Sequence, residues 1–279
     1  MKRLALTLLG WLLVALLAGC ATVAPPSGPE AAAPREAAEA AWARVLDRFV
    51  DARGEVDFHA LAADRVDLDT YLRHIALTPL TPLSAPERDR PDDQLAHLIN
   101  AYNALSMFNV IDSGFPAQHA GFAKLRFFVL RRFEIGGRAM SLYSFENDVI
   151  RPLARELREP RIHFALNCSA RSCPQLPRVP FTGAALRAEL ERETRAFFAR
   201  RDAYCVDDAA QTVWLSALLD FYPEDFVPAA APTLAAYAAQ WAAQPAPPAY
   251  RTAFLPYDWT IAARGTSPPV PAAGAACGT

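Results

Sequence analysis

Residues 91–114 read PDDQLAHLINAYNALSMFNVIDSG, and this stretch decides the fold. Pro91 fits the first turn of a helix, and Asp92 and Asp93 complement the positive end of its dipole. Leucine, isoleucine, methionine and aromatic residues then recur until Gly114 ends the segment. Because these apolar residues fall on most sides of the predicted helix, we expect it to lie at the centre of the molecule.

The chain on either side of this segment predicts further helices. Apolar residues recur at helical spacing in several places, and Ser141 and Thr182 stand where N-cap residues are expected. The predicted helices cover about residues 42–50, 64–77, 91–114, 142–153 and 183–200.

Strands are predicted in shorter pieces. Gly136-Gly137 can adopt positive φ and so close a β-hairpin between residues 127–135 and 138–142. A second hairpin joins 204–206 to 212–215, and residues 161–167 and 255–259 are also strand-like; we expect the last to pack as a final strand onto the core. The sequence therefore predicts an α+β fold, a helix-rich single domain with small antiparallel hairpins and a short central sheet.

The N-terminus carries the features of an export signal. Lys2 and Arg3 precede an apolar run over residues 4–18, which is short of the roughly 20 apolar residues that span a bilayer. The run ends in Leu17-Ala18-Gly19-Cys20, which resembles the lipobox of bacterial lipoproteins, and no Asp follows the cysteine. We therefore expect cleavage before Cys20, a lipid on its thiol, and a position on the periplasmic side of the outer membrane.

These signals divide the chain into four parts. We predict a lipoprotein signal peptide over residues 1–19, a flexible tether over 20–36, a single globular domain over 37–262 and a disordered tail over 263–279. The tether and the tail are rich in proline, alanine and glycine, so neither buries enough apolar surface to order itself.

Composition excludes several classes of function. Cleavage removes Lys2 and Arg3, which leaves 28 − 2 = 26 basic residues against 30 acidic residues and a formal charge of −4. This balance gives no basic surface for nucleic acid. The five histidines show no zinc-type spacing, and there is no glycine-rich nucleotide motif, so we predict no metal and no cofactor.

Four motifs resemble one protein family in their order and spacing. The family is the one catalogued as domain of unknown function 547, and the resemblance spans about residues 56–261 but implies no settled activity. Within the motifs, Tyr102, Asn103 and Cys173 are predicted binding residues. The chain has Asn147 where the family often has histidine and His97 where it has an aromatic residue, which puts any mechanism that needs a histidine at position 147 in doubt. The motifs are LINAYNAL (98–105), HFALNCS with CPQL (163–169 and 173–176), FY with DF (221–226) and LPYDW (255–259).

Cys168 is the sharpest candidate for a nucleophile. A thiol at the end of a strand, entering a loop of small residues, is where a nucleophile would be presented. His163 is the candidate base, and Asn100 or backbone amides would stabilise an oxyanion. In a strand, however, side chains alternate, so His163 and Cys168 would face opposite sides and lie roughly 16 Å apart at about 3.3 Å per residue. Unless the loop doubles back, the partner of Cys168 would then be Glu146, His97 or Asn100.

A disulfide between Cys168 and Cys173 is the competing interpretation. The four residues between them allow their Cα atoms to approach within about 7 Å, and an oxidising periplasm preserves disulfides. Such a bond would leave no nucleophile and would brace a loop instead.

The polar candidates have competing interpretations as well. Asn100 and Asn103 share a helix face, where buried amides pin a loop by hydrogen bonds or line a cleft. Glu146 is either an exposed acid of a first helical turn or the ionised partner of Arg151 or His163.

Two classes of function remain open. In the first, the protein is a membrane-anchored periplasmic thiol-dependent hydrolase or acyltransferase that uses Cys168. In the second, it is a non-catalytic envelope module that binds a peptide, a glycan or a partner protein, braced by the Cys168–Cys173 disulfide. The expected partners are the membrane, through the lipid on Cys20, and an unidentified periplasmic substrate or protein, but no nucleic acid.

Overall fold

The predicted central helix is present and buried. In the computed structural model, which describes residues 22–23, 33–80, 91–266 and 277, helix α6 runs from Pro91 to Asp112. Sixteen of its 22 residues are buried, and they fall on all its sides. This confirms the interpretation of its apolar pattern, since a helix that is hydrophobic all round lies in a core.

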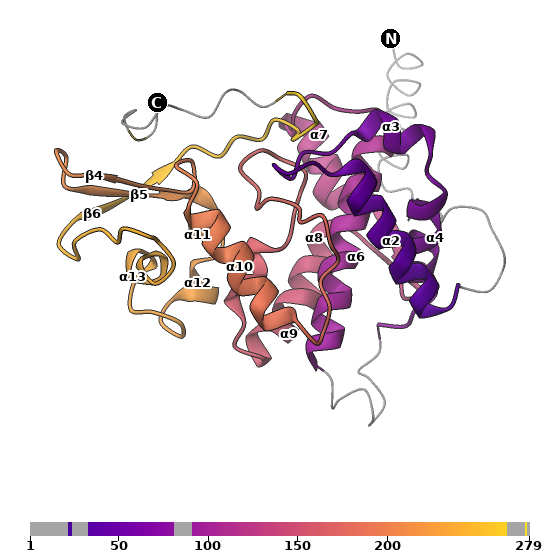
Figure 1. The fold of residues 1–279 in the computed structure, drawn as a ribbon, viewed down its shortest axis with the longest axis horizontal. Coiled ribbons are helices and arrows are strands. Elements are labelled where there is room, and N and C mark those ends of the chain that lie inside the picture. The colour runs from indigo at the N-terminus through magenta and orange to yellow at the C-terminus, as the bar shows by residue number, and fades with distance from the viewer. Residues whose placement is uncertain (1–21, 24–32, 81–90, 267–276, 278–279) are drawn as a thin grey trace, which may run out of the picture.

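Helices pack on both sides of α6 (Figure 1). On one side, α3 (Phe58–Ala63) and α4 (Val66–Leu77) contact it, and α2 (Arg35–Phe49) packs on both. On the other side lie α8 (Leu142–Phe145), the π-helical turn η2 (Glu146–Ile150) and α10 (Leu186–Phe198). Helix α9 (Arg151–Glu156) continues η2. The main hydrophobic core is therefore built around α6.

One predicted cap is correct and the other is wrong. Ser141 caps α8, because its side chain accepts a hydrogen bond from the Ser144 amide. Thr182 does not cap α10, which begins at Leu186. The reason is Glu189, whose carboxylate accepts from both the amide and the hydroxyl of Thr182 and holds residues 182–185 in a turn before the helix.

The Gly136-Gly137 hairpin forms as predicted, but its first strand is shorter. Strands β2 (Arg132–Ile135) and β3 (Arg138–Met140) are antiparallel, and the two glycines have φ of 58° and 74°. Strand β1 (Thr22–Val23), within the predicted tether, adds to β2 in parallel. Residues 127–130, predicted as strand, belong to the π-helical turn η1 (Arg126–Leu130), which continues α7 (Gly121–Leu125). An apolar run of this length does not distinguish a strand from a helix, and the buried Phe127 anchors it to the core.

The second predicted hairpin also forms and gains a third strand. Strands β4 (Tyr204–Asp207) and β5 (Thr212–Ser216) are antiparallel, and β6 (Arg251–Leu255) pairs with β5 in parallel. The final strand therefore lies before the predicted 255–259, because the chain leaves the sheet at Pro256. Helices α11 (Ala217–Phe221), α12 (Pro223–Phe226) and α13 (Leu234–Ala239) lie between β5 and β6 in the chain.

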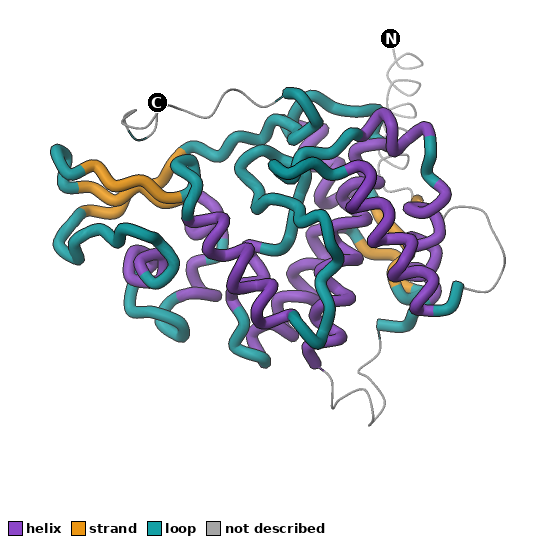
Figure 2. The backbone as a smooth tube through the Cα atoms, in the orientation of Figure 1, coloured by secondary structure: helices purple, strands orange, loops and turns teal. Residues whose placement is uncertain are grey.

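Residues 161–167 are not the predicted strand. Pro160–Phe164 form a 3₁₀ helix, η3, because Pro160 suits a first turn and the Glu159 side chain accepts from the Arg161 amide. The strands instead form two separate three-stranded mixed sheets with helices between them (Figure 2). The predicted class is confirmed, since the molecule is a helix-rich α+β single domain.

The predicted signal peptide, Cys20 and most of the tether and tail lie outside the described residues. Within the described ranges, no helix is both long and apolar enough to cross a membrane. Cys277, in the predicted tail, is bonded to Cys205 of β4.

Candidate functional site

A cavity of about 400 Å³ gathers five of the predicted site residues. Its walls come from helices α6, α7, α8 and α11, the turns η1, η2 and η3, the residue that follows α11, and the loops after η3 and β6. Most of its surface is apolar and aromatic. The predicted residues that line it are Tyr102, Glu146, His163, Cys168 and Cys173.

Helix α6 positions the loop that carries the two cysteines. The Asn103 side chain donates to the carbonyl of Ala165 over 3.0 Å and accepts from the amide of Asn167 over 2.7 Å. One turn further on, the hydroxyls of Ser106 and Ser169 lie 3.1 Å apart. Asn103 is therefore a residue that pins this loop by buried hydrogen bonds, one of the two roles that the sequence predicted for it.

Asn100 lies outside the cavity and has a similar structural role. Its amide donates to the carbonyl of Phe181 over 2.8 Å, and its oxygen accepts from the Phe181 amide and from the Trp42 indole. The predicted oxyanion donor is thus fully engaged in holding a different loop. His97 also lies elsewhere, with its ring edge-on to His74 at 5.8 Å.

Cys168 and Cys173 form the predicted disulfide. Their Cα atoms are 6.1 Å apart, within the range for such a bond. The Tyr257 hydroxyl donates to Cys173 Sγ over 3.2 Å, and His119 Nε2 donates to the Cys168 carbonyl over 2.9 Å. Burial lowers the pKa of His119 to about 4, so its ring is neutral at pH 7 and carries the proton on the donating nitrogen. In this bonded state Cys168 has no thiol.

His163 and Cys168 line the same cavity, contrary to the expectation that they face opposite sides. That expectation required a strand, and the η3 turn removes both the alternation and the separation of roughly 16 Å. His163 Nε2 lies 2.8 Å from Asp225 Oδ2, and the imidazole stacks on Tyr222 at 4.5 Å. His163 is thus oriented by a carboxylate and an aromatic ring from the α12 region.

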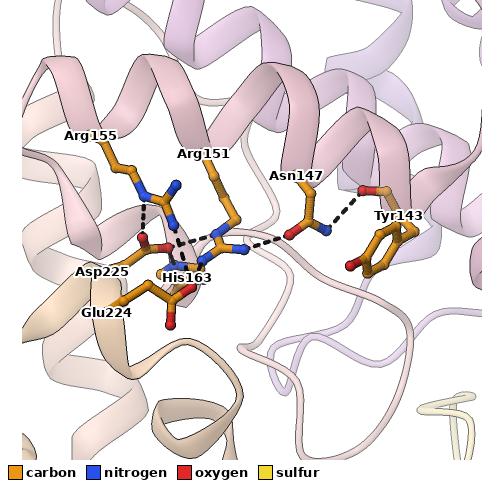
Figure 3. A network of polar contacts seen from close by, with 7 residues as sticks. All are labelled: Tyr143, Asn147, Arg151, Arg155, His163, Glu224 and Asp225. Atoms are coloured by element: carbon orange, nitrogen blue, oxygen red, sulfur yellow. Dashed lines mark hydrogen bonds and ion pairs between the residues drawn. The ribbon is translucent and has the colours of Figure 1, made fainter.

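Asp225 is the centre of a charged network that includes His163 (Figure 3). Arg151 Nε and Arg155 Nε donate to its carboxylate over 2.7 and 2.5 Å. Burial raises the pKa of Asp225, but the hydrogen bonds from His163 and the two arginines outweigh it and hold the pKa well below its usual range. Asn147 joins this network, because its side chain accepts from Arg151 and donates to the Tyr143 carbonyl.

Glu146 faces the cavity rather than solvent. It opens the π-helical turn η2 and is 8% exposed, so it is not the surface acid that was one alternative. Its predicted partners, Arg151 and His163, bind Asp225 instead. Burial first, and then the charge and hydrogen bonding of Glu146, raise the pKa of Tyr102 and Tyr222 above the usual range of phenols. Both phenols therefore stay protonated at pH 7 and donate to this carboxylate. Glu146 also belongs to a π-helical turn, and turns of this kind recur at functional sites.

Several residues that line the cavity, and Asp225 behind His163, were not predicted as site residues. Tyr222, Asp225, Tyr257 and Trp259 belong to the quoted motifs, which were the available signal, although residues 255–259 were interpreted as a packing strand. Lys124 carried no such signal, and its Nζ lies 3.2 Å from the centroid of the Trp259 ring. Within the described part of the chain, no group of three or more histidine, cysteine or acidic side chains is arranged to hold a metal ion.

Comparisons with known proteins agree with the motifs over the central part of the chain. No curated protein and no solved structure matches the sequence. Residues 87–198, a range that includes helices α6 to α10, match the model of the family described as protein of unknown function, DUF547, which supports the family indicated by the sequence motifs.

Proposed function

We propose that this chain is a lipid-anchored envelope protein whose domain binds a small molecule in the aromatic cavity. The observation that carries the proposal is the Cys168–Cys173 disulfide in the cavity wall. Because both sulfur atoms are bonded, the predicted nucleophile is blocked, whereas the cavity itself is formed. A largely apolar pocket with a few polar groups is the usual form of a small-molecule site.

The disulfide acts as a brace in this proposal. It closes the loop of residues 168–173, which lies between α6 and the Tyr257 segment. Its sulfur atoms contact the Tyr257 hydroxyl at 3.2 and 3.9 Å. Such a bond is stable in an oxidising compartment, which agrees with export through the predicted signal peptide.

One observation favours a second candidate, a thiol-dependent hydrolase or acyltransferase. His163 lines the same cavity as Cys168, and Asp225 orients its ring as the third member of a catalytic triad would. This activity requires reduction of the disulfide, which frees Cys168 as the nucleophile.

Alkylation of protein purified from the periplasm separates the two candidates. The binding module predicts that iodoacetamide adds to no cysteine of the folded protein, and that Cys168 and Cys173 react only after dithiothreitol. Peptide mass mapping identifies the modified residues. Alkylation of Cys168 without reductant would refute the binding module and support the enzyme; the Cys173→Ser variant, which frees Cys168, is the positive control for its labelling.

The membrane anchor has a separate test. Metabolic labelling with palmitate is expected to mark the wild-type protein and the Cys277→Ser variant, which keeps the lipobox, but not Cys20→Ser. The first two are expected in the outer-membrane fraction. Label on Cys20→Ser, or a wild-type protein that remains soluble, would contradict the proposed anchor.

A further inference from the structure

Glu146 differs from the other buried glutamates of the described residues. An arginine, or the backbone and hydroxyl of Thr182, binds the carboxylates of Glu55, Glu159, Glu189 and Glu193. Glu146 has two phenols as partners, and no ion pair joins it to a cationic side chain of the described part. A buried carboxylate without a countercharge is costly, so its position in the wall of a cavity indicates a use for its charge.

The wall of the cavity nearest the disulfide is aromatic. The ring centroids of Tyr257 and Trp259 are 4.5 Å apart, Phe221 stacks on Trp259 at 6.0 Å, and Phe128 lies edge-on to Trp259 at 6.1 Å. Aromatic faces attract cations through their quadrupoles, most strongly at tryptophan. Lys124 demonstrates this property of the wall, because its ammonium group already lies over the Trp259 ring.

We propose that the cavity binds an organic cation, an ammonium group that carries apolar substituents, with Glu146 as its countercharge and the Phe221–Tyr257–Trp259 wall as its aromatic surface. This inference rests on the proposed function, since it names the class of ligand for the same cavity. The volume of about 400 Å³ accommodates a small alkylammonium compound.

The other charges around the cavity are consistent with this ligand. Asp225 binds His163, and the two arginines that could oppose a cation, Arg151 and Arg155, are held by Asp225 and Glu224. Lys124 is the cation of the described chain that lines the cavity, and its place over Trp259 is the one the ligand would take. Lys124 therefore competes with the ligand for the aromatic wall.

Choline and 3,3-dimethyl-1-butanol provide the test, because they share a shape and differ in the charged nitrogen. In isothermal titration of the oxidised full domain, we expect choline to bind at least about tenfold more tightly than the neutral alcohol. Glu146→Gln, which keeps an acceptor for both phenols, is expected to remove about tenfold of choline affinity and to change alcohol binding by less than about twofold. Asp148→Asn, an exposed acid of the same η2 turn, is the control and is expected to bind both compounds as the wild type does.

The Lys124→Met variant is expected to change the affinity for choline in the opposite direction to Glu146→Gln. Removal of the resident ammonium group is expected to strengthen choline binding several-fold, whereas a ligand that used Lys124 as its countercharge would bind less well. Weaker binding by Lys124→Met, equal binding of choline and the alcohol, or no binding of either compound would each overturn the cation proposal. Equal binding of choline and the alcohol would refute the cation proposal but leave the proposed small-molecule cavity in place. A free Cys168 thiol in the alkylation experiment would instead refute the proposed function. The two experiments therefore distinguish the failure of one proposal from the failure of the other.

Discussion

Asn103→Ala is expected to destabilise the protein strongly and to loosen the cysteine loop. The substitution removes a donor to the Ala165 carbonyl at 3.0 Å and an acceptor for the Asn167 amide at 2.7 Å. Both loop residues are buried, at 1% and 5% exposure, so water does not replace the lost partners without a rearrangement. The variant therefore leaves one buried carbonyl and one buried amide unpaired.

The size of the effect follows from these two groups. Each unsatisfied buried group costs about 1–3 kcal/mol, so the free energy of unfolding is expected to fall by roughly 2–6 kcal/mol. This is a large part of the roughly 5–15 kcal/mol by which a domain is stable. Because the same hydrogen bonds hold the chain just before Cys168, dithiothreitol is also expected to reduce the Cys168–Cys173 disulfide faster in the variant.

Urea unfolding followed by circular dichroism, with the disulfides intact, measures the first effect, and timed alkylation measures the second. Gln94→Ala is the control, because it truncates an amide nine residues earlier on the same helix. A loss of less than about 1 kcal/mol in Asn103→Ala, together with an unchanged rate of reduction, would refute the role of this amide in positioning the loop.

Three further outcomes are expected. Burial lowers the pKa of His97 and His119 from 6.5 to about 4, so between these pH values the unfolded chain binds protons that the folded chain does not. The free energy of unfolding is therefore highest above pH 6.5 and falls toward pH 4, by about 3 kcal/mol for each histidine. An unfolding temperature that stays constant across this window would contradict the prediction. Asp225→Asn leaves the buried Arg151 without its main countercharge and is expected to cost about 3 kcal/mol in urea unfolding, more than the exposed control Asp148→Asn. Gly54→Ala places a Cβ 2.7 Å from the Leu176 amide nitrogen at a φ of +75°, and it is expected to cost at least about 1–2 kcal/mol; a neutral effect in thermal unfolding would show that this close approach relaxes freely.

Features set by local chemistry were predictable from the sequence. The apolar pattern of α6, the positive-φ glycines of the β2–β3 hairpin and the Ser141 cap each depend on neighbours within a few residues. Residues 161–167 were not predictable in this way. Their apolar and polar side chains alternate as in a strand, but Asn103, more than sixty residues away, takes the backbone groups of Ala165 and Asn167 that a sheet would otherwise pair.

The same distinction applies to the cavity. The motifs identified four lining residues, Tyr102, His163, Cys168 and Cys173, because they are chemically distinctive in the sequence itself, and Glu146 was a fifth candidate outside the quoted motifs. Asp225 had no assigned role, since its contact with His163 spans 62 residues and forms only when the α12 region folds against η3. Lys124 was missed for a similar reason, because only the folded structure brings its ammonium group over the distant Trp259 ring.

The hydrogen-bond donors around Cys168 bear on the choice between an enzyme and a binding module. Acyl transfer needs preorganised donors aimed at a developing oxyanion. In the oxidised protein the Cys168 amide donates to Cys173 Sγ, the Ser169 amide donates to the Asn167 side chain, and the Asn100 amide donates to Phe181. These three donors are therefore already engaged. An enzyme would need reduction of the disulfide to release both its nucleophile and one of these amides, whereas a binding cavity with Glu146 in its wall needs neither change.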